Sequence, residues 1–72
     1  MSLYDQVVQV SKPYLGPATE QFIARQCKLL KIDASSMTSQ NLAALSKWME
    51  SGAKLVMDEG KAKELASRVK VL

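Results

Sequence analysis

The chain of 72 residues contains no histidine and only one cysteine, Cys27. Histidine is the commonest general base and metal ligand, so its absence excludes Ser-His-Asp and Cys-His arrangements and a phosphorelay through histidine. One cysteine cannot form an internal disulfide, and a zinc site needs several Cys or His ligands. We therefore expect a protein that is not an enzyme, that has no cofactor and no metal site, and that resides in the cytoplasm, a reducing compartment.

The sequence also lacks any long apolar run. No stretch approaches the ~18 residues that a membrane span needs, and the N-terminus has no apolar region of the signal-peptide kind. With 47% hydrophobic and 24% charged residues, the composition is that of a globular domain and not of a disordered tail. This length indicates a single domain over residues 1–72, and we expect no membrane association.

Helical periodicity is visible in four segments, whereas strand patterns are poor. We expect an all-α fold, a compact bundle of about four short helices over residues 3–11, 17–30, 39–57 and 59–70. Pro13 disfavours helical geometry at the residue before it, so the first helix should stop or kink near Ser11. Pro17 suits the first position of the second helix, where its missing N–H has no partner to lose.

The third segment has the broadest apolar face. Its members are Leu42, Leu45, Trp48, Met49, Ala53, Leu55 and Val56. Thr38 or Ser39 can cap this helix, and Asp58 can cap the fourth. Gly52 falls inside the apolar face, although a glycine within a helix costs about 1 kcal/mol relative to alanine. We therefore expect the backbone of another helix to approach closely at Gly52.

The second segment places a polar residue, Gln26, inside its apolar stripe. The apolar members of that stripe are Ala18, Phe22, Ile23, Leu29 and Leu30. Gln26 could line a polar pocket between helices, or it could bond to a backbone carbonyl or helix end within an ordinary core. The second interpretation is favoured, because buried polar groups nearly always have partners. Cys27 is interpreted as a small buried hydrophobe and not as a reactive thiol.

Four residues are candidates for binding a partner: Tyr14, Trp48, Met49 and Met57. Aromatic and methionine side chains at the border of an apolar face are typical of binding surfaces. Tyr14 could instead cover the core where two helices meet, and a small domain also needs its only Trp for its core. We predict a helical interaction module, adaptor or regulatory, that binds a protein partner or itself through an apolar helix face.

The net charge of +3 leaves a nucleic-acid-binding helical domain as the alternative. The lysines that would have to form one continuous surface are Lys28, Lys31, Lys47, Lys54, Lys61 and Lys63. The basic residues are spread over all four segments and interleaved with acids, and no helix carries a cluster of Arg, Asn and Gln for reading bases. A solvated charged face is therefore favoured over a nucleic-acid partner.

The stretches YLGPATEQFIARQ and LKIDASSMTSQNLAALSKWM carry a resemblance that covers roughly residues 14–49. Together they resemble small helical domains attached to bacterial signalling proteins, which have a Leu/Ile-Gly-Pro turn, a helix and then a helix start with Leu-Thr. Leu15, Gly16 and Pro17 match the turn, and Met37-Thr38 stands in place of Leu-Thr. The resemblance implies a bacterial cytoplasmic regulatory or adaptor module, and it implies no site residues.

Overall fold

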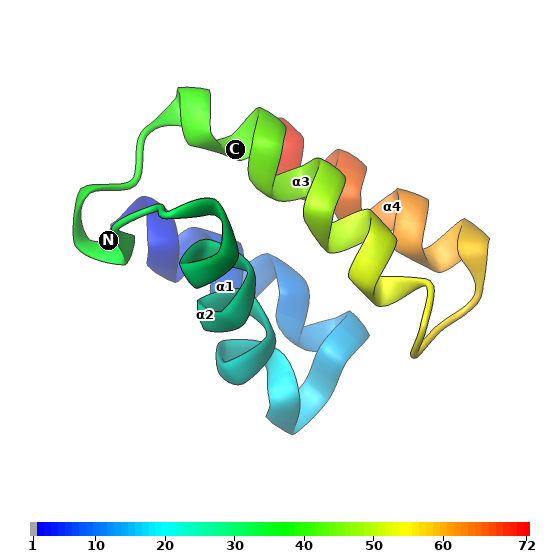
Figure 1. Cartoon of the computed structure of the whole chain (residues 1–72). Coiled ribbons are helices and arrows are strands. Elements are labelled where there is room, and N and C mark those ends of the chain that lie inside the picture. Colours follow the sequence, from blue (N-terminus) through cyan, green and yellow to red (C-terminus); the bar gives the residue numbers. More distant parts are fainter. Residues whose placement is uncertain (1) are drawn as a thin grey trace.

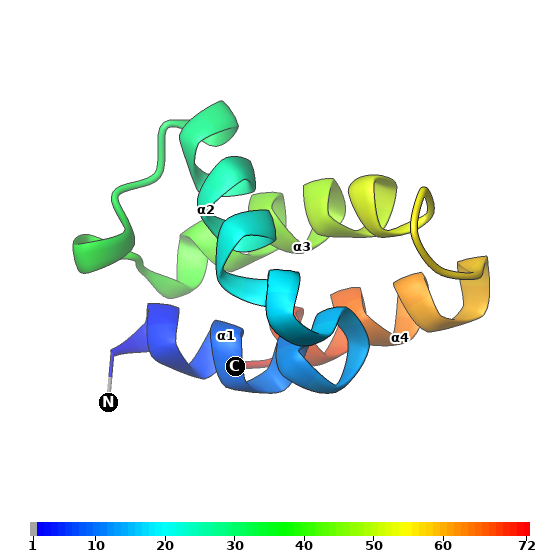
Figure 2. The same ribbon diagram turned by 90° about the horizontal axis from the view of Figure 1, so that it is seen from below.

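The computed structural model describes residues 2–72, which form an all-α bundle, as the sequence predicts (Figure 1). Its helices are α1 (Leu3–Leu15), α2 (Thr19–Leu30), α3 (Ser39–Ala53) and α4 (Glu59–Lys70), with short 3-10 turns at Gly16–Ala18 and Ala34–Ser36. The most extensive contact joins α3 and α4, while α1 packs on α2 and α4, and α2 packs on α3. Each helix therefore packs mainly on two others, and Figure 2 shows the same arrangement from below.

The core is built from one apolar face of each helix. Its buried apolar residues are Val7, Val8, Ile23, Cys27, Leu42, Leu45, Met49, Ala53, Ala62, Leu65, Ala66 and Val69. Their spacing of three and four residues within each helix is that of an amphipathic helix with one buried stripe. No helix within residues 2–72 is long and apolar enough to cross a membrane.

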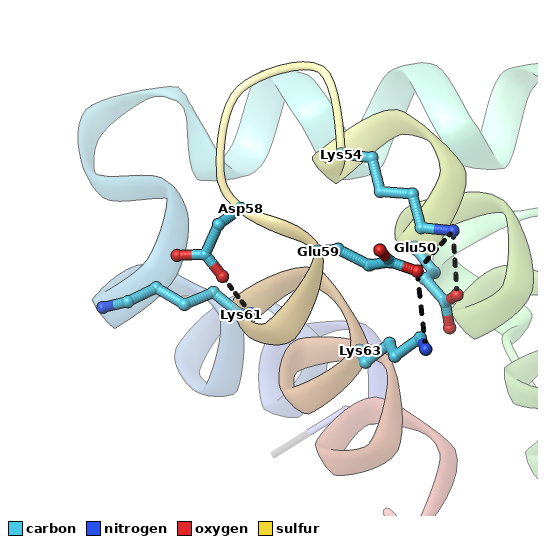
Figure 3. A network of polar contacts seen from close by, with 6 residues as sticks. All are labelled: Glu50, Lys54, Asp58, Glu59, Lys61 and Lys63. Atoms are coloured by element: carbon cyan, nitrogen blue, oxygen red, sulfur yellow. Dashed lines mark hydrogen bonds and ion pairs between the residues drawn. The ribbon is translucent and has the colours of Figure 1, made fainter.

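Side-chain caps fix the starts of α3 and α4. The backbone N–H of Thr38 donates to Asn41 Oδ1 at 2.9 Å, and Thr38 is the N-cap of α3. The Asp58 carboxylate accepts from the backbone N–H of Lys61 at 2.8 Å (Figure 3). Such bonds satisfy polar backbone groups that have no partner within the first helical turn. The expected caps of both helices are thereby confirmed.

The expected end of α1 near Ser11 is wrong, because the helix continues through Pro13 to Leu15. Pro13 lies in the last turn of α1 and is exposed, so its ring meets solvent and not the core. Its missing N–H removes only the bond that the Gln9 carbonyl would have accepted. The helix ends at Gly16, whose φ of 61° lies in the left-handed region that glycine adopts without strain.

The end of α3 also differs from the prediction, which extended this helix to residue 57. The helix ends at Ala53 and is followed by a tight turn, in which Leu55 N–H donates to the Gly52 carbonyl and Val56 N–H donates to the Ala53 carbonyl. This turn carries Val56 away from the buried face of α3, while Leu55 lies at the same edge of the apolar arc as Trp48. Both side chains are consequently exposed, although the sequence places them on the apolar face.

Candidate functional site

An apolar groove lies between α2 and α3, and we call it the α2–α3 groove. Four large apolar residues line it while remaining exposed to solvent: Leu29 (59%), Trp48 (48%), Leu55 (87%) and Val56 (69%). The remaining lining residues are Phe22, Arg25, Gln26, Ser51 and Gly52. Only one other large apolar residue of the described chain is exposed, Val71 after α4. Exposed apolar side chains are therefore concentrated in this groove.

Each wall of the groove is one face of a helix. The wall residues of α2 are Phe22, Arg25, Gln26 and Leu29, and those of α3 are Trp48, Ser51, Gly52 and the following Leu55. Both sets have the spacing i, i+3, i+4 and i+7, which places side chains along one helix face. A span of seven residues is about 10 Å of α-helix. The groove is thus about two helical turns long.

Gly52 allows the two walls to approach closely. A Cβ atom at residue 52 would lie 3.1 Å from Phe22 Cζ and 3.2 Å from Gln26 Nε2. The close approach expected at Gly52 is therefore present. It is made by two side chains of α2, however, and not by the backbone of another helix as the sequence had suggested.

Gln26 lies where the core meets the groove. It is buried and lines the groove, and its amide nitrogen is directed towards Gly52. None of the side-chain hydrogen bonds found within residues 2–72 involves this amide. The bond to a backbone carbonyl or helix end that the sequence favours is thus not found in the described part of the chain. The amide is available to a molecule that enters the groove.

The four candidate partner-binding residues occupy different environments. Trp48 lines the groove. Met49 lies in the middle of the buried face of α3 and is fully buried, so the prediction that it contacts a partner is corrected. Met57 and Tyr14 are partly buried against the core, and neither lines the groove. Partial burial, with Glu64 of α4 close by, raises the pKa of Tyr14. The structure therefore brings only Trp48 of these four to the groove.

Leu29, Leu55 and Val56 were missed, because the sequence assigns all three to buried faces. A signal for Leu55 was present: it follows Trp48 by seven residues, so both lie at the same edge of the apolar arc of α3. An amphipathic helix of a small bundle buries a stripe of roughly 100°. The arc of α3 is wider than that stripe, so one edge of it had to remain exposed.

Basic residues flank the groove on both sides. Arg25 lines it from α2. On α3, Lys47 forms a shallow depression with Trp48 and Ser51, which adjoins the groove. No Asp or Glu lines the groove or this depression. The surroundings of the apolar lining are therefore positively charged.

Other lysines are engaged in ion pairs at the junction of α3 and α4 (Figure 3). Lys54 Nζ lies 3.5 Å from Glu50 Oε2 and 3.9 Å from Glu59 Oε1, and Lys63 Nζ lies 3.4 Å from Glu59 Oε1. Exposed pairs of this kind stabilise a protein by no more than about 1 kcal/mol each. They nevertheless neutralise two of the lysines on which a nucleic-acid surface would depend.

The remaining lysines of that set do not gather on one face. Lys28 and Lys31 belong to the end of α2, whereas Lys61 belongs to the start of α4. Figures 1 and 2 show these two helix ends at opposite ends of the molecule. A phosphate backbone is followed by a continuous basic surface. This distribution gives no support to the nucleic-acid alternative.

Cys27 lies in the core beside Ile23 and is almost completely buried. Burial raises the pKa of its thiol, which disfavours the reactive thiolate. Within residues 2–72, no group of three or more His, Cys, Asp or Glu side chains is placed to hold a metal ion. The groove is therefore the feature from which a function can be argued.

Comparison with known proteins adds no assignment. No protein-family model matches the chain, and no curated protein or solved structure is significantly similar to it. The resemblance of the Leu15-Gly16-Pro17 turn and the following helices to domains of bacterial signalling proteins therefore assigns the chain to no family.

Proposed function

We propose that the chain is a small helical interaction module, adaptor or regulatory, that binds a protein partner through the α2–α3 groove and has no catalytic role. One observation carries the proposal: among residues 2–72, four of the five exposed large apolar residues line a single groove. Apolar surface gains about 25 cal/mol per Å² when it is removed from water. A concentrated exposed patch is accordingly typical of an interaction site in a soluble domain.

The composition of the groove supports the same proposal. Trp48 and Leu55 offer large apolar surfaces, and Trp is enriched among the residues that dominate binding energies. Arg25 and the Gln26 amide add polar groups that can orient a partner and distinguish it from others. An apolar centre with a few polar groups around it is the usual anatomy of a protein interface.

The proposal is tested by selecting peptides from a displayed library against the immobilised chain and then measuring their affinities for variants. Leu29→Glu and Leu55→Glu place a charge in the groove, and each should weaken binding at least about tenfold. Val71→Glu is the matched control, because Val71 is exposed and apolar but lies outside the groove. It should leave the affinity within about twofold.

Two results would contradict the proposal. Selected peptides could bind the wild type and both groove variants equally well, which would place their binding site elsewhere. Alternatively, repeated selection could yield no binding peptide while the chain remains monomeric at high concentration. In either case the exposed groove would not be the interaction surface.

A further inference from the structure

We infer that the partner presents an acidic amphipathic helix, which lies in the α2–α3 groove with its carboxylates against the basic residues of both walls. The inference rests on the proposed function and specifies the partner for the same surface. It follows from three properties of the groove: its charge, its length and the hydrogen bonding of the backbone groups in its walls.

The charge of the groove has one sign. Arg25 lines the groove from α2, Lys47 shares the adjoining depression with Trp48 and Ser51 of α3, and no acid lines the groove. Glu20 lies on the opposite face of α2, since it precedes Phe22 by two residues and helix neighbours are three or four residues apart. Glu50 of α3 is already paired with Lys54. A partner with acidic side chains would therefore meet uncompensated positive charge on both walls.

The length and backbone of the groove favour a helical partner. Both walls extend for about 10 Å, which matches two turns of a helix that anchors residues i, i+3 or i+4, and i+7. The walls are α-helices, so most of their N–H and C=O groups are bonded within their own helix. An extended peptide would find few backbone partners there, whereas a helix satisfies its own backbone groups.

A second copy of this chain fits the groove poorly. Each copy carries a net charge of +3, and a two-fold contact between two grooves would bring Arg25 and Lys47 of both copies into one interface. Like charges facing each other across an interface suppress association. The groove thus favours a different, acidic chain over self-association.

Two synthetic 18-residue peptides test the inference. Both carry Leu at positions i, i+3, i+4 and i+7, with Glu at the flanking positions of one peptide and Lys at those of the other. Fluorescence anisotropy with the full chain should show the Glu peptide binding at least about tenfold more tightly than the Lys peptide. The difference should shrink as salt is raised, because exposed charges are screened.

A charge-reversal variant makes the test specific to the groove. In Arg25→Glu/Lys47→Glu the preference should invert, so that the Lys peptide binds more tightly. Lys12→Glu/Arg68→Glu is the matched control, because it changes the net charge equally at exposed residues of α1 and α4, which do not line the groove. The control should retain the preference for the Glu peptide. Circular dichroism of each variant checks that it remains folded.

The other outcomes overturn the inference in distinguishable ways. If both peptides bind equally and Leu55→Glu abolishes their binding, the acidic partner is excluded while the proposed function stands. If neither binds and the chain sediments as a dimer that Leu55→Glu dissociates, the occupant is a second copy. If neither binds and the chain is monomeric, the inference fails, and the library selection above decides the proposed function separately.

Discussion

The Phe22 ring lies directly over Gly52, so that its Cζ atom would be 3.1 Å from a Cβ atom at residue 52. Gly52→Ala therefore forces the ring to move, and overpacking of this kind costs about 1–3 kcal/mol. Alanine is favoured over glycine in a helix by only about 1 kcal/mol. We expect Gly52→Ala to lower the free energy of unfolding by about 1 kcal/mol in urea denaturation.

Removing the ring should reverse the sign of this effect. In a Phe22→Ala background, Gly52→Ala should raise the free energy of unfolding by up to about 1 kcal/mol, because the helix preference remains. The other close atom, Gln26 Nε2 at 3.2 Å, is the end of a flexible side chain that can move aside. The four proteins form a double-mutant cycle, which isolates the coupling between the two residues. An equal effect of Gly52→Ala in both backgrounds would show that the ring does not restrict residue 52.

Met49 and Leu55 are both assigned to one apolar face by the sequence, but they should respond very differently to substitution. Met49→Ala removes a fully buried side chain and should lower the free energy of unfolding by about 2–5 kcal/mol. Leu55→Ser alters an exposed side chain and should change the free energy of unfolding by less than about 0.5 kcal/mol. Similar losses in urea denaturation would mean that Leu55 is part of the core.

The Ser11 hydroxyl is buried, and its oxygen has no hydrogen-bond partner in the described part of the chain. Ser11→Ala should therefore raise the free energy of unfolding by about 1 kcal/mol, because it removes an unpaired polar group. Ser46→Ala is the matched control, since the buried Ser46 hydroxyl donates to the Ala43 carbonyl at 3.0 Å. Ser46→Ala should show no such gain in thermal unfolding. If both substitutions raised the stability equally, the unpaired state of the Ser11 hydroxyl would not be the cause.

Burial raises the pKa of the Cys27 thiol above its ordinary value of 9.0. Above pH 9, the unfolded chain releases this proton while the folded chain retains it. The contribution of Cys27 to stability is therefore complete below that pH and falls as the pH rises towards the folded pKa. The urea midpoint should fall as the pH rises above about 9, and it should fall less in Cys27→Ala. An identical fall in both proteins would assign the alkaline loss to other groups.

The number and type of the helices could be predicted because the signals for them are local. The caps at Thr38 and Asp58 and the periodic apolar residues of each segment were sufficient. The ends of α1 and α3 were not predictable to the same degree. Pro13 costs α1 one hydrogen bond and crowds the Gln9 carbonyl. Whether the helix continues past this local cost depends on the contacts that Tyr14 and Leu15 make with the core, which are a tertiary property.

Only part of the groove could be predicted from the sequence. Trp48 was identified because an aromatic residue at the border of an apolar face is typical of a binding surface. Leu29 was placed in the core because a helical wheel gives the apolar arc of a helix but not the part of that arc that a neighbour covers. Val56 is exposed because α3 ends at Ala53, and the turn that follows is not visible in the periodicity of the sequence.

The packing of α3 on α4 also has a kinetic consequence. Residues 54–58 join these two helices, and closing so short a loop costs little chain entropy. Contacts that are local in sequence form early, so the α3–α4 hairpin should fold before α1 closes back on α4. The α2–α3 groove is complete only when α2 has docked on that hairpin. A ligand for the groove would therefore select states in which α2 is docked over every intermediate in which it is not.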